Sequence, residues 1–231
     1  MLIIAHRGNQ VGPRPLEENS VDSITRCLDR GWAVETDIRR GGDGRFYISH
    51  DPAPVSEENE AQTFLRSWRR WPGVPIALNV KECGYEADLI KFLAEENVLS
   101  QLFLFDMELV ENVPGQMAQI FRRLSPFIRL AARVSDRREP LDRALAIQEA
   151  DVIWLDEFDQ HWAQAEDIRR LQNAGKTVHA VSPDLHGFSL ETARRRWRDF
   201  FSWGVDGICT DYPEVLEGDL QGAGREKGTT L

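Results

Sequence analysis

The sequence is poor in cysteine and lacks long apolar runs. Its three cysteines, Cys27, Cys83 and Cys209, stand far apart without a CxxC pair, which predicts neither a disulfide framework nor a zinc cluster. No segment approaches the roughly 18 apolar residues that a membrane-spanning helix needs. The first residues, MLIIAHRG, carry no basic start and too short an apolar run for a signal peptide. We therefore expect reduced thiols, no transmembrane segment and a cytoplasmic location.

Positive charge is also in short supply. The chain has 28 Lys and Arg against 38 Asp and Glu, which gives a formal net charge of −10. Such a chain repels the phosphates of a long nucleic acid, so nucleic acid is not an expected partner. A small anionic substrate would need a local group of cations. Nothing in the sequence defines an oligomer interface, and the oligomeric state stays open.

Eight short apolar runs alternate with amphipathic segments along the chain. Strands are expected at 2–5, 33–38, 76–80, 102–105, 128–132, 152–155, 177–181 and 207–210. Helices are expected at 20–30, 86–95, 110–123, 141–149, 163–173 and 190–203. This alternation is typical of repeated βα units that build a parallel sheet.

Eight strands separated by helices predict a (β/α)8 TIM barrel of the α/β class, as a single domain over residues 1–216. A doubly wound open sheet is the alternative, but HRGNQVGP lacks the GxGxxG turn that usually follows the first strand of such a sheet. Residues 41–49 predict a hairpin or extended insertion after the second strand, and 61–69 a small helix. Residues 217–231 have little apolar content and are expected to form a flexible C-terminal tail.

Polar and charged side chains gather where the apolar runs end. They are His6, Arg7, Glu35, Asp37, Asn79, Lys81, Asp106, Arg133, Asp156, Ser182, Asp184 and Asp211. In barrels of this kind the C-terminal ends of the strands build the active site. The pattern therefore predicts an enzyme site at this face of the barrel.

Two pairs among these residues predict a site for a hard cation. Glu35 and Asp37 lie two residues apart on a strand, so their side chains point to the same face and both can reach one ion. Asn79 and Lys81 have the same spacing on the next strand, and they add an amide oxygen and a fixed positive charge. This set suits Mg²⁺ or Ca²⁺ and leaves coordination positions for a phosphate. The simpler alternative is that Glu35 and Asp37 form only the polar half of an alternating strand.

His6 and His50 are the candidates for proton transfer. An imidazole near neutrality can take a proton from an attacking hydroxyl or give one to a leaving alkoxide. Arg7 and Lys81 would neutralise phosphoryl oxygens as negative charge builds on them. Each histidine also has a simpler interpretation, His6 as a packed core residue and His50 as a turn residue before Asp51.

Read in order, the segments AHRG, LEENS, ETD, DGRFYISHD, NVK and GVDGICTDYP resemble the glycerophosphodiester phosphodiesterase family. This family belongs to the superfamily of phosphoinositide-phospholipase-C-like barrel phosphodiesterases. The resemblance spans nearly the whole chain. It implies a barrel with a Ca²⁺- or Mg²⁺-dependent site that cleaves a small phosphodiester substrate to a phosphomonoester and an alcohol.

The resemblance also implies roles for individual residues. These are general acid/base catalysis for His6 and His50, metal binding for Glu35 and Asp37, phosphate binding for Arg7 and Lys81, and support of the first loop by Glu18 and Asn19. Asp51, beside His50, is a further candidate for substrate contact or support. Asp184 lies with His186 in the loop PDLHG, which would either contact substrate or merely turn the chain. The nucleophile would be water or a neighbouring hydroxyl of the substrate.

Three departures from the family pattern mark a divergent member. Asn79 stands where the family commonly has a glutamate, which predicts weaker metal binding. The insertion at 51–75 is short, and 181–184 replaces a strand end that usually carries an aromatic residue, so the alcohols of the substrate stay open. The alternatives are a sphingomyelinase-D-like phospholipid phosphodiesterase, a catalytically inactive metal- or phosphate-binding barrel, and a barrel aldolase or isomerase that uses Lys81.

Overall fold

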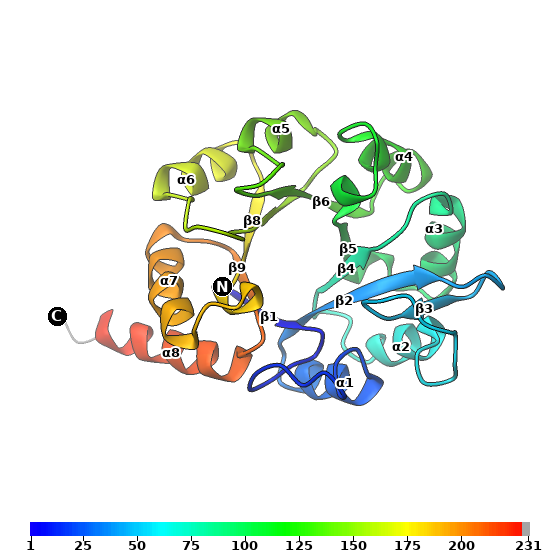
Figure 1. Cartoon of the computed structure of the whole chain (residues 1–231), viewed down its shortest axis with the longest axis horizontal. Coiled ribbons are helices and arrows are strands. Elements are labelled where there is room, and N and C mark those ends of the chain that lie inside the picture. The colour runs from blue at the N-terminus through cyan, green and yellow to red at the C-terminus, as the bar shows by residue number, and fades with distance from the viewer. Residues whose placement is uncertain (228–231) are drawn as a thin grey trace.

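The eight predicted apolar runs form a closed ring of parallel strands. The computed structural model describes residues 1–227. The strands of the ring are β1 (Leu2–His6), β2 (Ala33–Arg40), β4 (Ile76–Val80), β5 (Leu102–Phe105), β6 (Arg129–Val134), β7 (Val152–Leu155), β8 (Thr177–Val181) and β9 (Gly207–Thr210). Each strand pairs with the next one of the ring, and β1 pairs with both β2 and β9. The predicted (β/α)8 TIM barrel is confirmed (Figure 1).

Helices cover the outside of the ring, as Figure 1 shows. They are α1 (Val21–Asp29), α2 (Ala61–Trp68), α3 (Glu86–Glu95), α4 (Gln116–Leu124), α5 (Leu141–Ala146), α6 (Ala165–Asn173), α7 (Leu190–Trp203) and α8 (Pro213–Lys227). Three short 3₁₀ helices are η1 (Leu99–Gln101), η2 (Met107–Leu109) and η3 (Pro183–His186). In α7, Ser189 caps the first turn, and Trp197 and Phe200 are buried on one face. Within residues 1–227, no helix combines the length and the apolar character needed to cross a membrane.

Aromatic side chains fill the inside of the ring. The Trp154 ring lies 5.9 Å from the Phe103 ring and 4.4 Å from the Phe105 ring, measured between centroids. His179 lies beside them, with its ring 5.5 Å from that of Phe103, and is almost wholly buried. The barrel is therefore a packed core rather than a pore, which leaves the strand ends as its functional surface.

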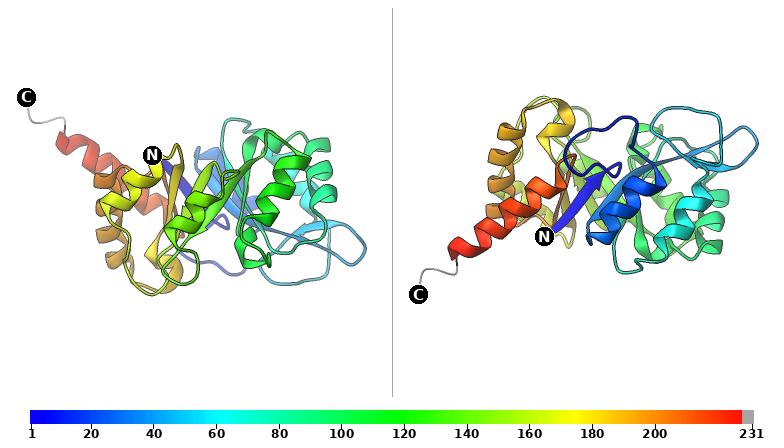
Figure 2. Two further views of the ribbon diagram at one scale, coloured as in Figure 1. Left: turned by 90° about the horizontal axis from the view of Figure 1, so that it is seen from above. Right: turned by 90° about the horizontal axis from the view of Figure 1, so that it is seen from below.

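The insertion after β2 is a hairpin, as predicted. β3 (Phe46–Ile48) pairs antiparallel with the end of β2 and lies outside the ring. Figure 2 shows the hairpin reaching away from the barrel. The backbone N–H of Ser49 then donates to the carbonyl oxygen of Asp37 over 3.2 Å. This bond returns the chain to the end of β2 just before His50.

One helix prediction was wrong at its start. Residues 110–115 are not helical, and α4 begins only at Gln116. Pro114 and Gly115 interrupt the segment, and Gly115 takes a left-handed φ of 78°. Glu111 accepts hydrogen bonds from the backbone N–H groups of Gly115 and Met117, which anchors the new helix start.

The prediction of a flexible tail from residue 217 onward needs correction, because α8 continues to Lys227. Leu216 is fully buried, and Glu217 accepts hydrogen bonds from Arg30 over 2.8 Å and from the Trp32 indole over 3.2 Å. These contacts with the turn between α1 and β2 anchor the start of a segment that has few apolar residues of its own. Residues 228–231 of the predicted tail lie outside the described residues.

Candidate active site

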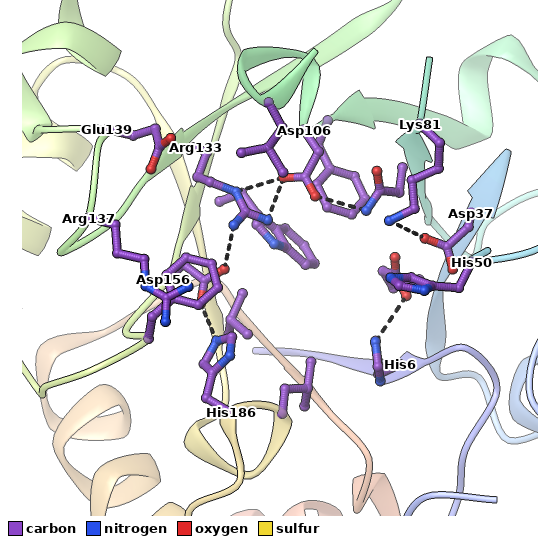
Figure 3. A pocket seen from close by; sticks show the side chains of 18 of the residues that line it. His6, Asp37, His50, Lys81, Asp106, Arg133, Arg137, Glu139, Asp156 and His186 are labelled. Atoms are coloured by element: carbon purple, nitrogen blue, oxygen red, sulfur yellow. Dashed lines mark hydrogen bonds and ion pairs between the residues drawn. The ribbon is translucent and has the colours of Figure 1, made fainter. Parts of the chain in front are cut away.

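A cavity of about 500 Å³ opens among the C-terminal ends of the ring strands (Figure 3). The sequence-predicted residues that line it are His6, Arg7, Glu35, Asp37, His50, Asn79 and Lys81. A second, more open cavity of about 840 Å³ is lined by Glu18, Asn19 and Asp51. Arg7 and His50 line both cavities, so the first and second cavities meet at these two side chains.

Asp37 is the acid with the most partners in the first cavity. Its side chain is 1% exposed, with Lys81 Nζ 3.0 Å from Oδ1 and Arg7 Nε 3.4 Å from Oδ2. Asn19 Nδ2 donates to Oδ2 over 3.0 Å. Burial acts to raise the pKa of Asp37, but Lys81 and Arg7 outweigh it and lower the pKa below its usual range. Asp37 is therefore a fixed negative charge that holds two cations over the cavity.

Glu35 shares a face of β2 with Asp37 but has fewer partners. Burial and the neighbouring Asp37 carboxylate raise the pKa of Glu35 to about 7. Its Oε2 lies 3.8 Å from His6 Nε2 and accepts no hydrogen bond from the described residues. Asn79, opposite Asp37 in the register of β2 and β4, likewise has a buried Oδ1 without a donor in this part of the chain. Such buried acceptors are costly unless something satisfies them.

The residues present fit a hard cation. Within residues 1–227, no group of three or more His, Cys, Asp or Glu side chains has the arrangement of a metal site. The set predicted here differs because one of its three donors is the amide of Asn79. Carboxylate and amide oxygens are the ligands that Mg²⁺ and Ca²⁺ take in proteins. A cation bound there would satisfy both Glu35 Oε2 and Asn79 Oδ1.

His6, at the end of β1, is held by a carboxylate from the far end of the chain. Its Nδ1 lies 2.7 Å from Asp211 Oδ1, and Asn9 Nδ2 donates to the same oxygen over 2.8 Å. Burial disfavours the charged imidazole, but the hydrogen bond to Asp211 and the carboxylate of Glu35 outweigh it and raise the pKa of His6. The sequence predicted that Asp211 lies at a strand end, but it did not indicate that Asp211 contacts His6.

Asp184 does not line the first cavity, but it supports the pair formed by His6 and Asp211. Its Oδ2 accepts from the backbone N–H of Asp211 over 3.0 Å, and both of its oxygens lie 3.0 Å from the Thr210 hydroxyl. A third partner is the Ser182 hydroxyl. Asp184 therefore fixes the backbone that carries Asp211, which in turn holds His6.

His50 reaches the junction of the cavities from the hairpin. Arg39 Nε and Nη2 donate to its carbonyl oxygen over 3.0 and 2.7 Å, which fixes the backbone. Its Nδ1 lies 3.0 Å from Oδ1 of the exposed Asp51. Burial and the positive charges of Lys81 and Arg7 lower the pKa of His50. This shift favours the neutral imidazole, the state that accepts a proton.

The loop after β1 takes an unusual backbone path. Arg7 and Asn19 have φ values of 50° and 53°, and Gly8 has a φ of 80°. A Cβ at Gly8 would lie 2.6 Å from Ser23 Oγ, so this position needs glycine. Asn19 N donates to Arg7 O over 2.9 Å, and Arg7 Nη1 donates to Glu18 Oε2 over 3.2 Å. Glu18 and Asn19 thus hold Arg7 in a left-handed conformation that is uncommon for residues other than glycine.

A hydrogen-bonded network crosses the other side of the first cavity (Figure 3). Asp106 accepts from Asn79 Nδ2 over 2.8 Å and from Arg133 Nε over 2.7 Å. Arg133 Nη1 lies 3.1 Å from one oxygen of Asp156, and the other oxygen of Asp156 bonds to His186 Nε2. In the sequence, Asp106, Arg133 and Asp156 were visible only as polar residues at strand ends. We call these five side chains, with Asn79 at one end and His186 at the other, the cross-cavity network.

Solved structures share the fold of this chain over almost its whole length. A glycerophosphodiester phosphodiesterase from Agrobacterium tumefaciens has 17% identity and a TM-score of 0.68, covering 94% of this chain and 99% of its own. A glycerophosphoryl diester phosphodiesterase from Parabacteroides distasonis has 17% identity and a TM-score of 0.70, covering 96% and 86%. An Oleispira antarctica phosphodiesterase in complex with the product sn-glycerol-3-phosphate has 19% identity and a TM-score of 0.67, covering 96% and 97%.

The TM-score is lower for an enzyme of different chemistry than for these three structures. A mutant tryptophan synthase α-subunit from Pyrococcus furiosus has 13% identity and a TM-score of 0.56, covering 94% of this chain and 88% of its own. No protein-family model matches the sequence, and a search of curated proteins gives no significant match. At these identities the likeness is one of fold, and because one barrel fold hosts many reactions, function has to be argued from the site.

Proposed function

We propose that this protein is a metal-dependent phosphodiesterase that cleaves a glycerophosphodiester-like substrate to a phosphomonoester and an alcohol. The observation that carries the proposal is the junction of the two cavities at Arg7 and His50. A phosphodiester has two alcohol arms on one phosphate, and two cavities that meet beside cationic side chains suit such a molecule. The shared fold with solved glycerophosphodiester phosphodiesterases supports the same substrate class.

The phosphate would lie against Arg7 and Lys81. Both are fixed by Asp37, at 3.4 and 3.0 Å, so their charges are in place before substrate arrives. Preorganised cations of this kind stabilise the negative charge that builds on phosphoryl oxygens in the transition state. The ion pair with Asp37 also disfavours the rival use of Lys81 as a Schiff-base amine, which needs an unprotonated nitrogen.

Glu35, Asp37 and Asn79 would hold the divalent cation, Mg²⁺ or Ca²⁺. When bound, such an ion supplies positive charge that polarises the phosphoryl group. The buried oxygens of Glu35 and Asn79 that lack donors among the described residues support this set of ligands. Asn79 contributes no negative charge, so we expect a lower affinity than three carboxylates would give.

Proton transfer falls to the two histidines. His50 lines both cavities, at their junction, and takes the proton of the attacking water or substrate hydroxyl as the new P–O bond forms. His6 lines only the first cavity, and it gives its proton to the alkoxide that leaves there as the old P–O bond breaks. Asp211 orients the His6 ring and stabilises its protonated form.

The cytoplasm is the proposed location of this activity. Cys27, Cys83 and Cys209 are all free thiols, which suits a reducing compartment. Glycerophosphodiesters carry the glycerol phosphate unit of phospholipids without their acyl chains, so the proposed reaction belongs to lipid metabolism.

Hydrolysis of bis(p-nitrophenyl) phosphate and of glycerophosphodiesters by the purified protein tests the proposal. With Mg²⁺, Ca²⁺ or Mn²⁺ added, we expect turnover that a chelator abolishes. Undiminished turnover in chelator would contradict the metal dependence. Binding of metal and inorganic phosphate without turnover under any condition would instead identify a catalytically inactive binding barrel.

A further inference from the structure

The side of the first cavity away from the two catalytic histidines is built to bind more than a phosphate. We propose that it binds the leaving alcohol as a polyhydroxylated group and selects it against a cationic alcohol such as choline. This inference rests on the proposed phosphodiesterase function and names the substrate class of the same site. The side chains that form this wall, called the polyol wall below, are Arg133, Arg137, Arg138, Glu139, Asp156, Phe158 and His186.

The polyol wall carries both hydrogen-bond donors and hydrogen-bond acceptors. Glu139 is 5% exposed and is held by the Ser135 hydroxyl, so its carboxylate is a fixed acceptor. His186 bonds to Asp156 through Nε2, and among the described residues no hydrogen bond of its Nδ1 is found. The guanidinium of Arg138 adds donors. A hydroxyl group both donates and accepts, so an alcohol that carries several hydroxyls matches this combination of donors and acceptors.

Three side chains of the polyol wall, Arg133, Asp156 and His186, are held in place by one another. Arg133 is 8% exposed and lies between the carboxylates of Asp106, at 2.6 Å, and Asp156, at 3.1 Å. Asp156 in turn holds His186. Because Arg133, Asp156 and His186 already have partners, these three side chains need not reorganise when an alcohol binds, and their orientation is set by the cross-cavity network.

The one phenyl ring of the polyol wall, Phe158, offers no free face to a quaternary ammonium. Such cations bind over free aromatic faces, but the Phe158 ring already has Arg133 Cζ at 5.2 Å and Arg137 Cζ at 4.3 Å from its centroid. The His186 ring lies 4.4 Å from the same centroid. In the described part of the chain Arg138 lines the first cavity and forms no ion pair, so its charge would repel a cation.

The second cavity differs from the polyol wall in charge, because most of its charged lining residues are acidic. Glu18, Asp51 and Glu58 line it, and Arg7 at the junction is the only basic residue other than His50 among its described lining residues. The two arms of a diester therefore meet unlike surroundings, and the polyhydroxylated arm belongs in the first cavity, where His6 would protonate it.

Rates of hydrolysis of glycerophosphoinositol and glycerophosphocholine by the full chain with Mg²⁺ test the proposal. We expect the kcat/KM of the wild type to favour the inositol diester by at least about tenfold, the effect of one good hydrogen bond to a charged group. His186→Ala and Arg138→Glu should each lower this ratio about tenfold. Arg169→Glu, on the exposed surface of α6, is the matched control for charge reversal and should leave the ratio unchanged. A wild-type ratio near one, or a ratio that both wall variants preserve, would overturn the proposal.

A binding experiment in chelator separates failure of the polyol wall from failure of the phosphodiesterase function. We expect saturation-transfer NMR signals from free myo-inositol, but not from free choline, and their loss in His186→Ala. If inositol binds in this way and no diester is hydrolysed, the wall stands and the phosphodiesterase function is wrong. If both diesters are hydrolysed at equal rates and inositol does not bind, the function stands and the wall is wrong.

Discussion

Asn79 Nδ2 lies 2.8 Å from Asp106 Oδ2, and this hydrogen bond leaves the amide oxygen of Asn79 buried without a donor in the described part of the chain. It gives a physical reason for an amide rather than a carboxylate at this position. Burial already raises the pKa of Asp106, and a second carboxylate at this distance would repel it. The amide instead donates to Asp106 and still offers an oxygen to a cation.

Asn79→Asp should therefore destabilise the protein in the absence of metal. The variant loses a hydrogen bond to a charged group, which costs about 2 kcal/mol, and gains like-charge repulsion in a buried site. Added Mg²⁺ should restore part of the loss, because a third carboxylate binds the ion more strongly. Urea denaturation with chelator and with Mg²⁺ measures both effects. Asn173→Asp, at the exposed end of α6, is the control, and equal stabilities of the two variants in chelator would contradict the argument.

His50→Ala should keep the fold and lower kcat by about 10² to 10⁴, the range for a positioned acid or base. The control is His161→Ala, because His161 lies outside both cavities, 3.2 Å from Glu157, and should be nearly silent in catalysis. Steady-state kinetics on bis(p-nitrophenyl) phosphate at saturating metal compare the two. Wild-type turnover in His50→Ala would remove this residue from the mechanism.

Glu35→Gln should weaken divalent metal binding by about tenfold or more, since the change removes one of the two charges offered to the ion. Calorimetric titration with Mg²⁺ or Ca²⁺ measures the effect directly, without relying on turnover. Glu166→Gln, whose side chain is 80% exposed on α6, should titrate like the wild type. An unchanged titration in Glu35→Gln would place the metal elsewhere.

His179 should make stability depend on pH. Burial lowers the pKa of His179 to about 4, with Asp206 opposing the shift and Arg129 adding to it. The unfolded chain takes up a proton near pH 6.5, whereas the folded protein stays neutral at this residue until about pH 4. Stability should therefore fall as the pH is lowered through this window, by about 3 kcal/mol over its full width.

His179→Leu tests this pH effect, because leucine fits the apolar interior and does not titrate. Urea denaturation at several pH values between 7 and 4 should show a shallower loss of stability for the variant than for the wild type. The same slope in both proteins would assign the pH dependence to other groups.

Local pattern was enough to predict the fold. The alternation of apolar runs and amphipathic segments gave the positions of all eight ring strands, because side-chain burial in a strand or helix follows its own repeat. One exception was local, because Pro114 and Gly115 delayed the start of α4. The other was not, because Glu217 at the start of the polar segment bonds to Arg30 and Trp32, which lie far away in the sequence.

The candidate site was only half visible in the sequence. The i, i+2 spacing of Glu35 and Asp37 fixed their common face on β2, since side chains alternate along a strand whatever the rest of the chain does. By contrast, His6 and Asp211 are 205 positions apart and meet only because β1 closes the ring against β9. The cross-cavity network likewise needs the ends of four neighbouring strands and the loop that carries His186. The sequence by itself determined which side chains stand at the strand ends; closure of the ring decided which of them pair, because partners so far apart in the chain have no local signal.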